Sequence, residues 1–196
     1  MGGSDLPLFP LTSVLFPEGA LSLRVFESRY LDMIRDCARN DSGFGVCLIL
    51  HGAEVGEPAT PAAVGTCARI VDFNVQADGL LGILARGERR FRVQQTRVRD
   101  NGLVHAQVEW IEEGETQSVP AECGLLATIL ERFHEQAGGE YAHIERARYD
   151  DASWVAWRLA EALALEQTER QLLLQISDPI ERLTQLMHYV PRFQSG

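Results

Sequence analysis

Hydrophobic and polar positions alternate along the first two-thirds of this chain, which predicts β-strands. Four segments carry the pattern, at 66–75, 80–85, 90–98 and 103–110, and the continuous apolar run at 44–50 predicts a buried strand. Two shorter apolar runs, at 6–9 and 14–16, are broken by prolines. We expect them to form edge strands, because proline cannot donate to a β-ladder. At least six strands are enough to close, or nearly close, a barrel that hides its strand edges.

One helix and two hairpin turns are predicted within this region. The spacing of apolar residues becomes helical over 27–40. The apolar face of this helix is formed by Tyr30, Leu31, Ile34 and Ala38. The Ala-Asp-Gly sequence at 77–79 predicts one hairpin turn, and Asn101-Gly102 predicts another, because Asn-Gly favours the positive φ angles of tight turns.

The last third of the chain changes to helical spacing. A polar and acidic stretch at 112–120 marks the change. We therefore predict a β-rich domain at 1–117 and an α-helical domain at 118–196. Strands followed by helices indicate the α+β class, with the two kinds of element segregated.

Apolar spacing and capping residues locate four helices in the helical domain. The first is predicted from Leu125, Leu126, Ile129, Leu130 and Phe133, and ends at 138–139. The other three are marked by Asp151 or Ser153, by the capping-box pair Thr168 and Gln171, and by Asp178 before Pro179.

Charge and composition narrow the range of functions. The 196 residues include 18 basic and 28 acidic side chains, for a net charge of −10. This charge argues against a nucleic-acid partner, because proteins that bind duplexes present a basic surface to the phosphates. All 18 basic residues are arginine. Without lysine the chain has no P-loop and no Ser–Lys dyad, which excludes an ordinary ATPase and a lysine-dependent peptidase.

The cysteines and the hydropathy indicate the compartment. The cysteines at 37, 47, 67 and 123 form no CxxC motif, and three lie in apolar segments, where a free thiol behaves as a small hydrophobic group. The sequence shows no signal peptide and no apolar run of about 18 residues. We expect a cytoplasmic protein without a membrane partner.

The sequence contains no recognisable catalytic motif. The GxSxG and GxGxxG patterns are absent. His134 and His143 flank Glu135 and Glu140, but the HExxH spacing is missing and 138–139 would break a shared helix. We therefore expect a protein that is not an enzyme, with no catalytic residues, no metal and no cofactor.

A basic stretch between Arg86 and Arg99 stands out against the acidic average. It holds six arginines and one glutamate. The candidate basic patch comprises Arg90, Arg92, Arg97 and Arg99, with Arg90 and Arg92 on the strand face opposite Phe91 and Val93. Such a patch would bind phosphates or acidic peptides. The alternative is that these arginines pair with the acidic run at 109–115 on the following strand.

The N-terminal segment resembles a known family. The sequences LPLFPL at 6–11, VLFP at 14–17 and LSLRVFESRY at 21–30 resemble the N-terminal, substrate-binding domain of the Lon ATP-dependent proteases. Later segments agree with this pattern, at 44–46, 64–66, 78–79, 87–93, 171–173 and 182–183. Glu18 and Ser22 depart from it, standing where the family often has glycine and proline.

The resemblance implies a PUA-like β pseudo-barrel with one helix, followed by a C-terminal helical bundle. It implies a stand-alone bacterial protein that lacks the ATPase and Ser–Lys peptidase domains. The expected function is a non-catalytic protein-interaction module that binds unfolded or extended polypeptide. An RNA- or nucleotide-binding module that uses the 86–99 patch is the alternative. No sequence motif supports a small-molecule pocket.

Glu27 and Arg29 are charged residues within an apolar part of this signature. Unpaired buried charges are too costly to keep, so an ion pair that orients the following helix is the expected role. Contact with a ligand is the alternative.

Overall fold

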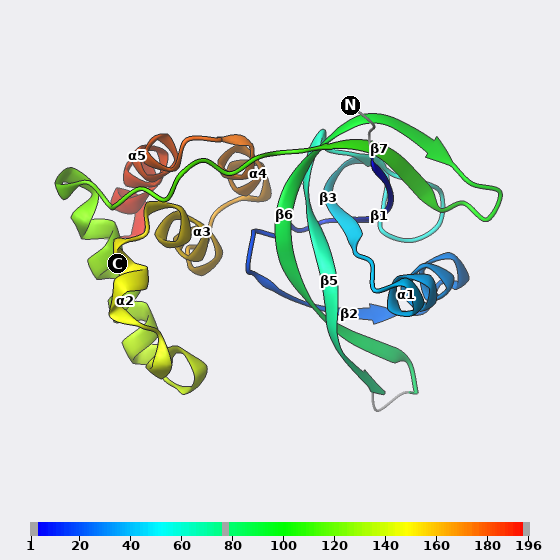
Figure 1. The fold of residues 1–196 in the computed structure, drawn as a ribbon, viewed down its shortest axis with the longest axis horizontal. Coiled ribbons are helices and arrows are strands. Elements are labelled where there is room, and N and C mark those ends of the chain that lie inside the picture. Colours follow the sequence, from blue (N-terminus) through cyan, green and yellow to red (C-terminus); the bar gives the residue numbers. More distant parts are fainter. Residues whose placement is uncertain (1–3, 76–78, 194–196) are drawn as a thin grey trace. The chain divides into compact units, whose positions relative to one another are not determined.

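The computed structural model describes residues 4–75 and 79–193, and the chain divides into two units. Unit 1 is Met1–Glu112 and unit 2 is Glu113–Gly196. Within the described residues, unit 1 holds a seven-stranded sheet and helix α1, and unit 2 holds helices α2 to α5 (Figure 1). The predicted α+β class is confirmed.

The strands of unit 1 close into a ring. They are β1 Ser4–Leu11, β2 Ala20–Val25, β3 Phe44–His51, β4 Thr60–Pro61, β5 Val64–Val75, β6 Leu81–Val98 and β7 Val104–Trp110. The order β1-β7-β6-β5-β3 returns to β1, because β1 also pairs with β3. β4 adds to β3, and β2 adds to β6.

Strand β1 closes the ring by changing partner halfway. Residues 4–7 pair antiparallel with β7, and residues 8–11 pair parallel with β3. The strand predicted at 6–9 is present, and each half of it has one neighbour, but β1 as a whole is not an edge strand because it joins β7 to β3. The predicted strand at 14–16 is wrong, because Leu15 and Phe16 are buried in a loop. The carbonyl of Leu15 accepts a hydrogen bond from the hydroxyl of Thr66 at 2.6 Å.

Strand β6 runs unbroken for 18 residues, where the sequence predicted two strands. Its first half pairs with β2 and β5, and its second half pairs with β5 and β7. Gly87 lies in the polar stretch that suggested a break. A Cβ atom there would lie 2.3 Å from the carbonyl oxygen of Phe16, so only glycine lets the buried loop approach the strand.

The turn between β6 and β7 uses one left-handed residue. Gly102 has φ of +81°, and its amide donates to the Arg99 carbonyl at 2.8 Å. Asn101 does not share the positive φ, so the hairpin is a three-residue loop with glycine at its last position and not the tight Asn-Gly turn. The other predicted turn, at 77–79, lies outside the described residues except for Gly79.

Helix α1 (Ser28–Asn40) packs on the sheet through a face that includes Tyr30, Met33, Ile34 and Cys37. The buried face is rotated slightly about the helix axis from the predicted one, because Leu31 is only half-buried and Ala38 is exposed. Tyr30 stacks on Phe9 of β1, with ring centroids 4.0 Å apart.

Unit 2 contains the four predicted helices. They are α2 Gly124–Ala137, α3 Ala152–Ala162, α4 Gln167–Gln175 and α5 Pro179–Tyr189. Asp151 and Asp178 cap α3 and α5 through their carboxylates. The capping box of α4 joins Glu166 and Glu169, so the predicted Thr168–Gln171 pair is wrong by two residues. On α2, the predicted apolar residues Leu125 and Phe133 are exposed while Leu126 and Leu130 are buried.

Arginine side chains close the C-terminal ends of two of these helices. The guanidinium of Arg170 donates to the carbonyls of Glu161 and Leu163 at the end of α3. The fully buried guanidinium of Arg182 donates to the carbonyl of Ile176 at 2.8 Å, just after α4, and lies 3.3 Å from the centroid of the Trp157 ring. Positive charge at a helix C-terminus is favourable because the last carbonyls have no partner within the helix.

We expect Arg182→Met to lower the free energy of unfolding by about 2–4 kcal/mol, because the carbonyl at the end of α4 loses a charged donor inside the core. Chemical denaturation followed by far-ultraviolet circular dichroism measures the change. Arg132→Met, on the exposed side of α2, is the matched control and should stay within about 0.5 kcal/mol of the parent. Equal losses in the two variants would contradict the prediction.

Candidate functional site

Three strands of unit 1 carry apolar residues side by side on one face. At one level Leu23 of β2, Ile83 of β6 and Phe73 of β5 lie across from one another. At the next level of the same face lie Val25, Leu81 and Val75. Since alternate residues of a strand share a face, these two levels form one continuous apolar surface.

Helix α1 covers only part of this surface. Val25 and Ile83 are buried in the same cluster as Met33 and Ile34 of α1. At the outer ends of the two levels, by contrast, Phe73 is 49% exposed and Val75 is 79% exposed. The apolar face of the sheet therefore continues past the helix into solvent.

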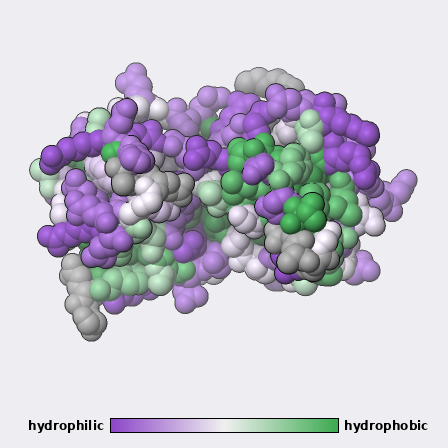
Figure 2. Space-filling view, turned by 90° about the horizontal axis from the view of Figure 1, so that it is seen from below, coloured by the Kyte–Doolittle hydropathy of each residue, from purple (hydrophilic) through white to green (hydrophobic). Residues whose placement is uncertain are grey.

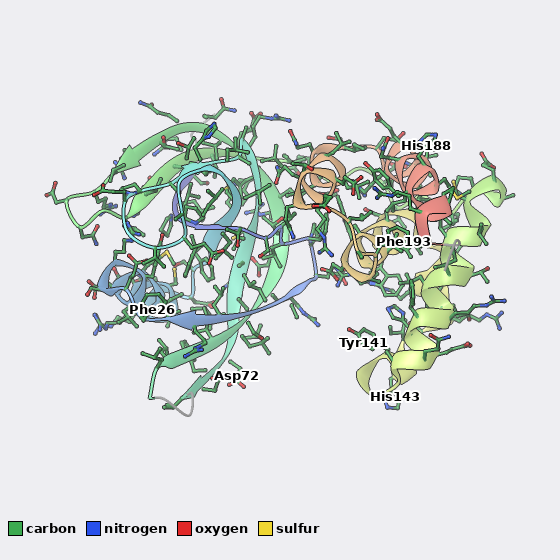
Figure 3. The ribbon with its side chains drawn as sticks, turned by 180° about the vertical axis from the view of Figure 1, so that it is seen from behind. Phe26, Asp72, Tyr141, His143, His188 and Phe193 are labelled. Atoms are coloured by element: carbon green, nitrogen blue, oxygen red, sulfur yellow. The ribbon has the colours of Figure 1, made fainter. Side chains whose placement is uncertain are left out.

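We call the outer part of this surface, together with the neighbouring Phe26, the hairpin face. It comprises the exposed Phe26, Phe73 and Val75 and the half-buried Leu23 and Leu81, which also pack against the core. Phe26, which is 53% exposed, lies at the end of β2 beside α1, as Figure 3 shows. Figure 2 shows apolar side chains gathered on one face of unit 1. A contiguous exposed apolar patch with polar surroundings marks an interaction surface.

Glu27 and Arg29 stand at the start of α1, next to the hairpin face, and form an ion pair. Glu27 Oε2 lies 2.9 Å from a guanidinium nitrogen of Arg29, and the two side chains are 20% and 8% exposed. Arg29 also donates to the carbonyl of Gly102 at 3.2 Å, in the turn between β6 and β7. Glu27 precedes the helix but makes no capping hydrogen bond through its side chain. Through Arg29, the ion pair therefore connects the start of α1 to the turn between β6 and β7.

The residues of the predicted basic patch do not form one surface. Arg90 is fully buried, although alternation had placed it with Arg92 on an exposed face. The reason is the buried 14–16 loop: Arg90 lies opposite Thr66, which binds that loop. Arg92 is exposed and lies opposite Glu109 of β7.

Arg97 and Arg99 gather instead around one carboxylate that the sequence did not single out. Asp5 Oδ2 lies 2.8 Å from Arg97 and 3.7 Å from Arg99, and His105 Nδ1 lies 3.1 Å away. Burial lowers the pKa of His105 below its ordinary value, so the imidazole is neutral at pH 7. Beside these arginines and Asn101 is an open depression of about 510 Å³. The arginines thus share one acidic partner and leave a small basic surface.

Several cysteine and histidine side chains of the described residues are buried. Across residues 4–75 and 79–193, no three His, Cys, Asp or Glu side chains are placed to hold a metal ion. Burial raises the pKa of Cys47 and of Cys67 to about 12, which keeps both thiols protonated and unreactive. His134 is buried in an aromatic cluster, with Nδ1 2.8 Å from the hydroxyl of Tyr149. None of the helices in these ranges has both the length and the apolar character to span a bilayer.

Sequence reasoning missed Phe73 and Val75 as candidate site residues. Alternation predicted their strand but gave no sign that α1 would leave them uncovered. The signal that was available is the length of the strand: the apolar alternation at 66–75 extends beyond what a single helix of 13 residues covers.

The comparisons with known proteins agree with one another. Residues 5–192 match the family model described as the ATP-dependent protease La (LON) substrate-binding domain. The chain is similar to a solved Lon N-terminal domain protein from Xanthomonas campestris, with 50% identity, a TM-score of 0.81, and coverage of 95% of this chain and 98% of that one. The N-terminal domain of Mycobacterium avium complex Lon protease shares the fold, with a TM-score of 0.69 at 16% identity, over 95% and 97% of the two chains.

Among curated proteins, the Lon protease of Cytophaga hutchinsonii is 24% identical over 96% of this chain. The match covers 24% of that protease, so this chain spans about a quarter of its length.

We expect Glu27→Gln to lower the free energy of unfolding by about 1–3 kcal/mol, because the buried guanidinium of Arg29 loses its counter-charge. Asp32→Asn is the matched control: it breaks the exposed pair between Asp32 and Arg35 on the same helix, and should cost less than about 1 kcal/mol. Urea denaturation gives both values. A Glu27→Gln variant that unfolds like the parent but no longer binds polypeptide would show that Glu27 contacts a ligand instead.

Proposed function

The chain belongs to the family of Lon substrate-binding domains, and on that premise we propose that it is a substrate-recognition module that binds unfolded or extended polypeptide through the hairpin face. The family domain is the substrate-binding part of the protease and is non-catalytic in itself. The hairpin face is the observation that carries the proposal, since unfolded chains expose the apolar side chains that such a surface can bury.

The energetics of the hairpin face suit weak and unselective binding. Burying an exposed aromatic or aliphatic side chain contributes about 1.5–3 kcal/mol, and part of that gain is offset by ordering the bound segment. Phe26 and Phe73, each about half exposed, and the more exposed Val75 are therefore the largest contributors we expect on this surface. Micromolar affinity for many sequences follows, as recognition of unfolded substrates requires.

We further propose that the ring of unit 1 is a PUA-like pseudo-barrel and that unit 2 is a helical bundle. The pairing of β1 with both β7 and β3 supports the first assignment. Arg170 and the buried Arg182, which join successive helices of unit 2, support the second. A place in the cytoplasm is supported by four free cysteines, all buried.

RNA binding through the 86–99 stretch has less support. Arg97 and Arg99 beside their open depression favour it. Against it, Arg90 is buried, and Asp5 already pairs with both Arg97 and Arg99. A structured RNA is therefore a second ligand to titrate: binding that weakens steeply with salt and is lost in Arg97→Ala would favour this function over the proposed one.

We expect the double variant Phe73→Ser, Val75→Ser to bind a labelled, permanently unfolded polypeptide at least about tenfold more weakly than the parent, since about 1.4 kcal/mol of apolar contact is lost. Fluorescence anisotropy measures the affinity, with a folded protein as the negative ligand.

The matched control is Val98→Ser. Val98 is an exposed valine of β6 that lies outside the hairpin face, opposite Val104. Unchanged affinity in Val98→Ser alongside the loss in the double variant supports the proposal. Equal affinity of all three proteins, or no binding by the parent, would contradict it.

A further inference from the structure

We propose that the open edge of β5 at Asp72–Val75 accepts an extended polypeptide segment as an additional β-strand, and that the preferred segment carries basic residues beside its apolar ones. This inference rests on the proposed function, because it describes how the bound chain would lie beside the hairpin face. It assigns the contact to backbone groups as well as to side chains.

The edge is open because β5 is longer than one of its neighbours. On one side, β6 pairs with β5 as far as Val75. On the other side, the pairing with β3 ends at Ala68. Within residues 4–75 and 79–193, no strand pairs with β5 beyond Ala68 on that side. A β-bulge between Ile70 and Asp72 interrupts the ladder with β6, so the regular part of the edge is 72–75.

The hydrogen bonding of Phe73 shows which backbone groups point outward. The amide of Phe73 donates to the carboxylate of Asp72 at 2.8 Å, so it is not directed at β6. Because strand amides point alternately to the two sides, the amides and carbonyls of Phe73 and Val75 face away from β6. An incoming strand paired at these two residues would also place its side chains next to those of the hairpin face.

Asp72 acts as a gate on this edge. Its carboxylate accepts the hydrogen bond of the outward amide of Phe73. An incoming strand would need that amide as the donor to one of its own carbonyls. Native proteins protect edge strands with such charged residues, which lowers the affinity for any passing chain. A bound segment must displace the carboxylate, and the edge therefore admits only segments that also gain apolar contact with Phe73 and Val75.

The charges along β5 favour a basic segment. Arg69 is bound by Glu88 at 2.7 Å and by Asp41 at 2.8 Å, and the carboxylate of Asp72 follows three residues later. Glu88 belongs to β6, on the other side of β5, so Asp72 and Asp41 are the carboxylates beside the edge, with one guanidinium. A second copy of this chain would bring the same carboxylates together across the edge and add to the repulsion between two chains of net charge −10. A segment with lysine or arginine beside alternating apolar residues meets opposite charges instead.

The test uses one labelled peptide in three forms. The parent has alternating valine and threonine between terminal arginines. In one form the amides of the valines are N-methylated, and in the other the amides of the threonines are. The N–H groups of a strand point alternately to its two sides, so all the N–H groups that face β5 belong to one residue type. One methylated form therefore keeps these donors and the other lacks them, while the side chains are the same in all three peptides.

We expect the parent and one methylated form to bind with similar affinity, and the other form to bind at least tenfold more weakly in anisotropy titrations. Equal binding of all three forms would overturn the edge inference while leaving the proposed function intact. Equal weakening of both methylated forms would overturn it too. If none of the three binds, and the unfolded polypeptide does not bind either, the proposed function fails with it.

Substitution of the gate gives an independent measurement. We expect Asp72→Ala to bind the parent peptide several-fold more tightly, because the amide of Phe73 becomes available, even though an acidic group facing a basic peptide is lost. Asp100→Ala, which removes an exposed carboxylate from the distant turn between β6 and β7, is the matched control and should bind no more tightly than the unmodified protein. Weaker binding by Asp72→Ala would overturn the inference. A dimer in sedimentation experiments that the parent peptide dissociates would overturn it in favour of a second copy of this chain.

Discussion

The structure of unit 1 depends on one long strand, β6, whose two halves pair with different neighbours. The second half of β6 pairs with β7 and completes the ring, while the first half leaves the ring and holds β2 and the outer part of β5. Only glycine at position 87, where the two halves meet, leaves room for the buried 14–16 loop. Because β6 does not break there, the apolar face of the ring extends into a three-stranded arm, and α1 is too short to cover the arm to its end.

Much of the fold could be predicted from local patterns in the sequence. A continuous apolar run located the strand at 44–50, alternation located the strand at 66–75, and Asp178 before Pro179 marked the start of α5. The errors share a cause, which is that a local pattern does not say what packs against a residue. Leu15 and Phe16 are apolar because a loop is buried, and not because a strand forms. The exposed Phe73 and the buried Ile83 show the same alternation but differ in their distance from α1.

The candidate site was predictable only in part for the same reason. Glu27 and Arg29 stood out as charges in an apolar segment, and the structure brings them together at 2.9 Å. The arginines at 86–99 stood out by their number, but their environments are set by distant segments. Arg90 lies under the 14–16 loop, and Arg97 and Arg99 meet Asp5, which lies some ninety residues earlier in the chain. In a chain without lysine, arginines must serve in the core, at helix ends and at the surface alike, so their clustering in the sequence does not by itself indicate a binding patch.

The change of partner within β1 also has a consequence for how the protein folds. The first half of β1 joins β7 across 100 positions of sequence, as in the contact of Asp5 with His105, and the second half joins β3 across fewer than 40. Contacts between such distant positions slow folding, because the entropy of closing a long loop is lost before the contact is gained. On the ribosome, β1 emerges before β7 and must wait for it before the ring can close. Until then the apolar residues of β1 are exposed, so a domain that we propose to bind unfolded chains passes, during its own synthesis, through a state that resembles its ligand.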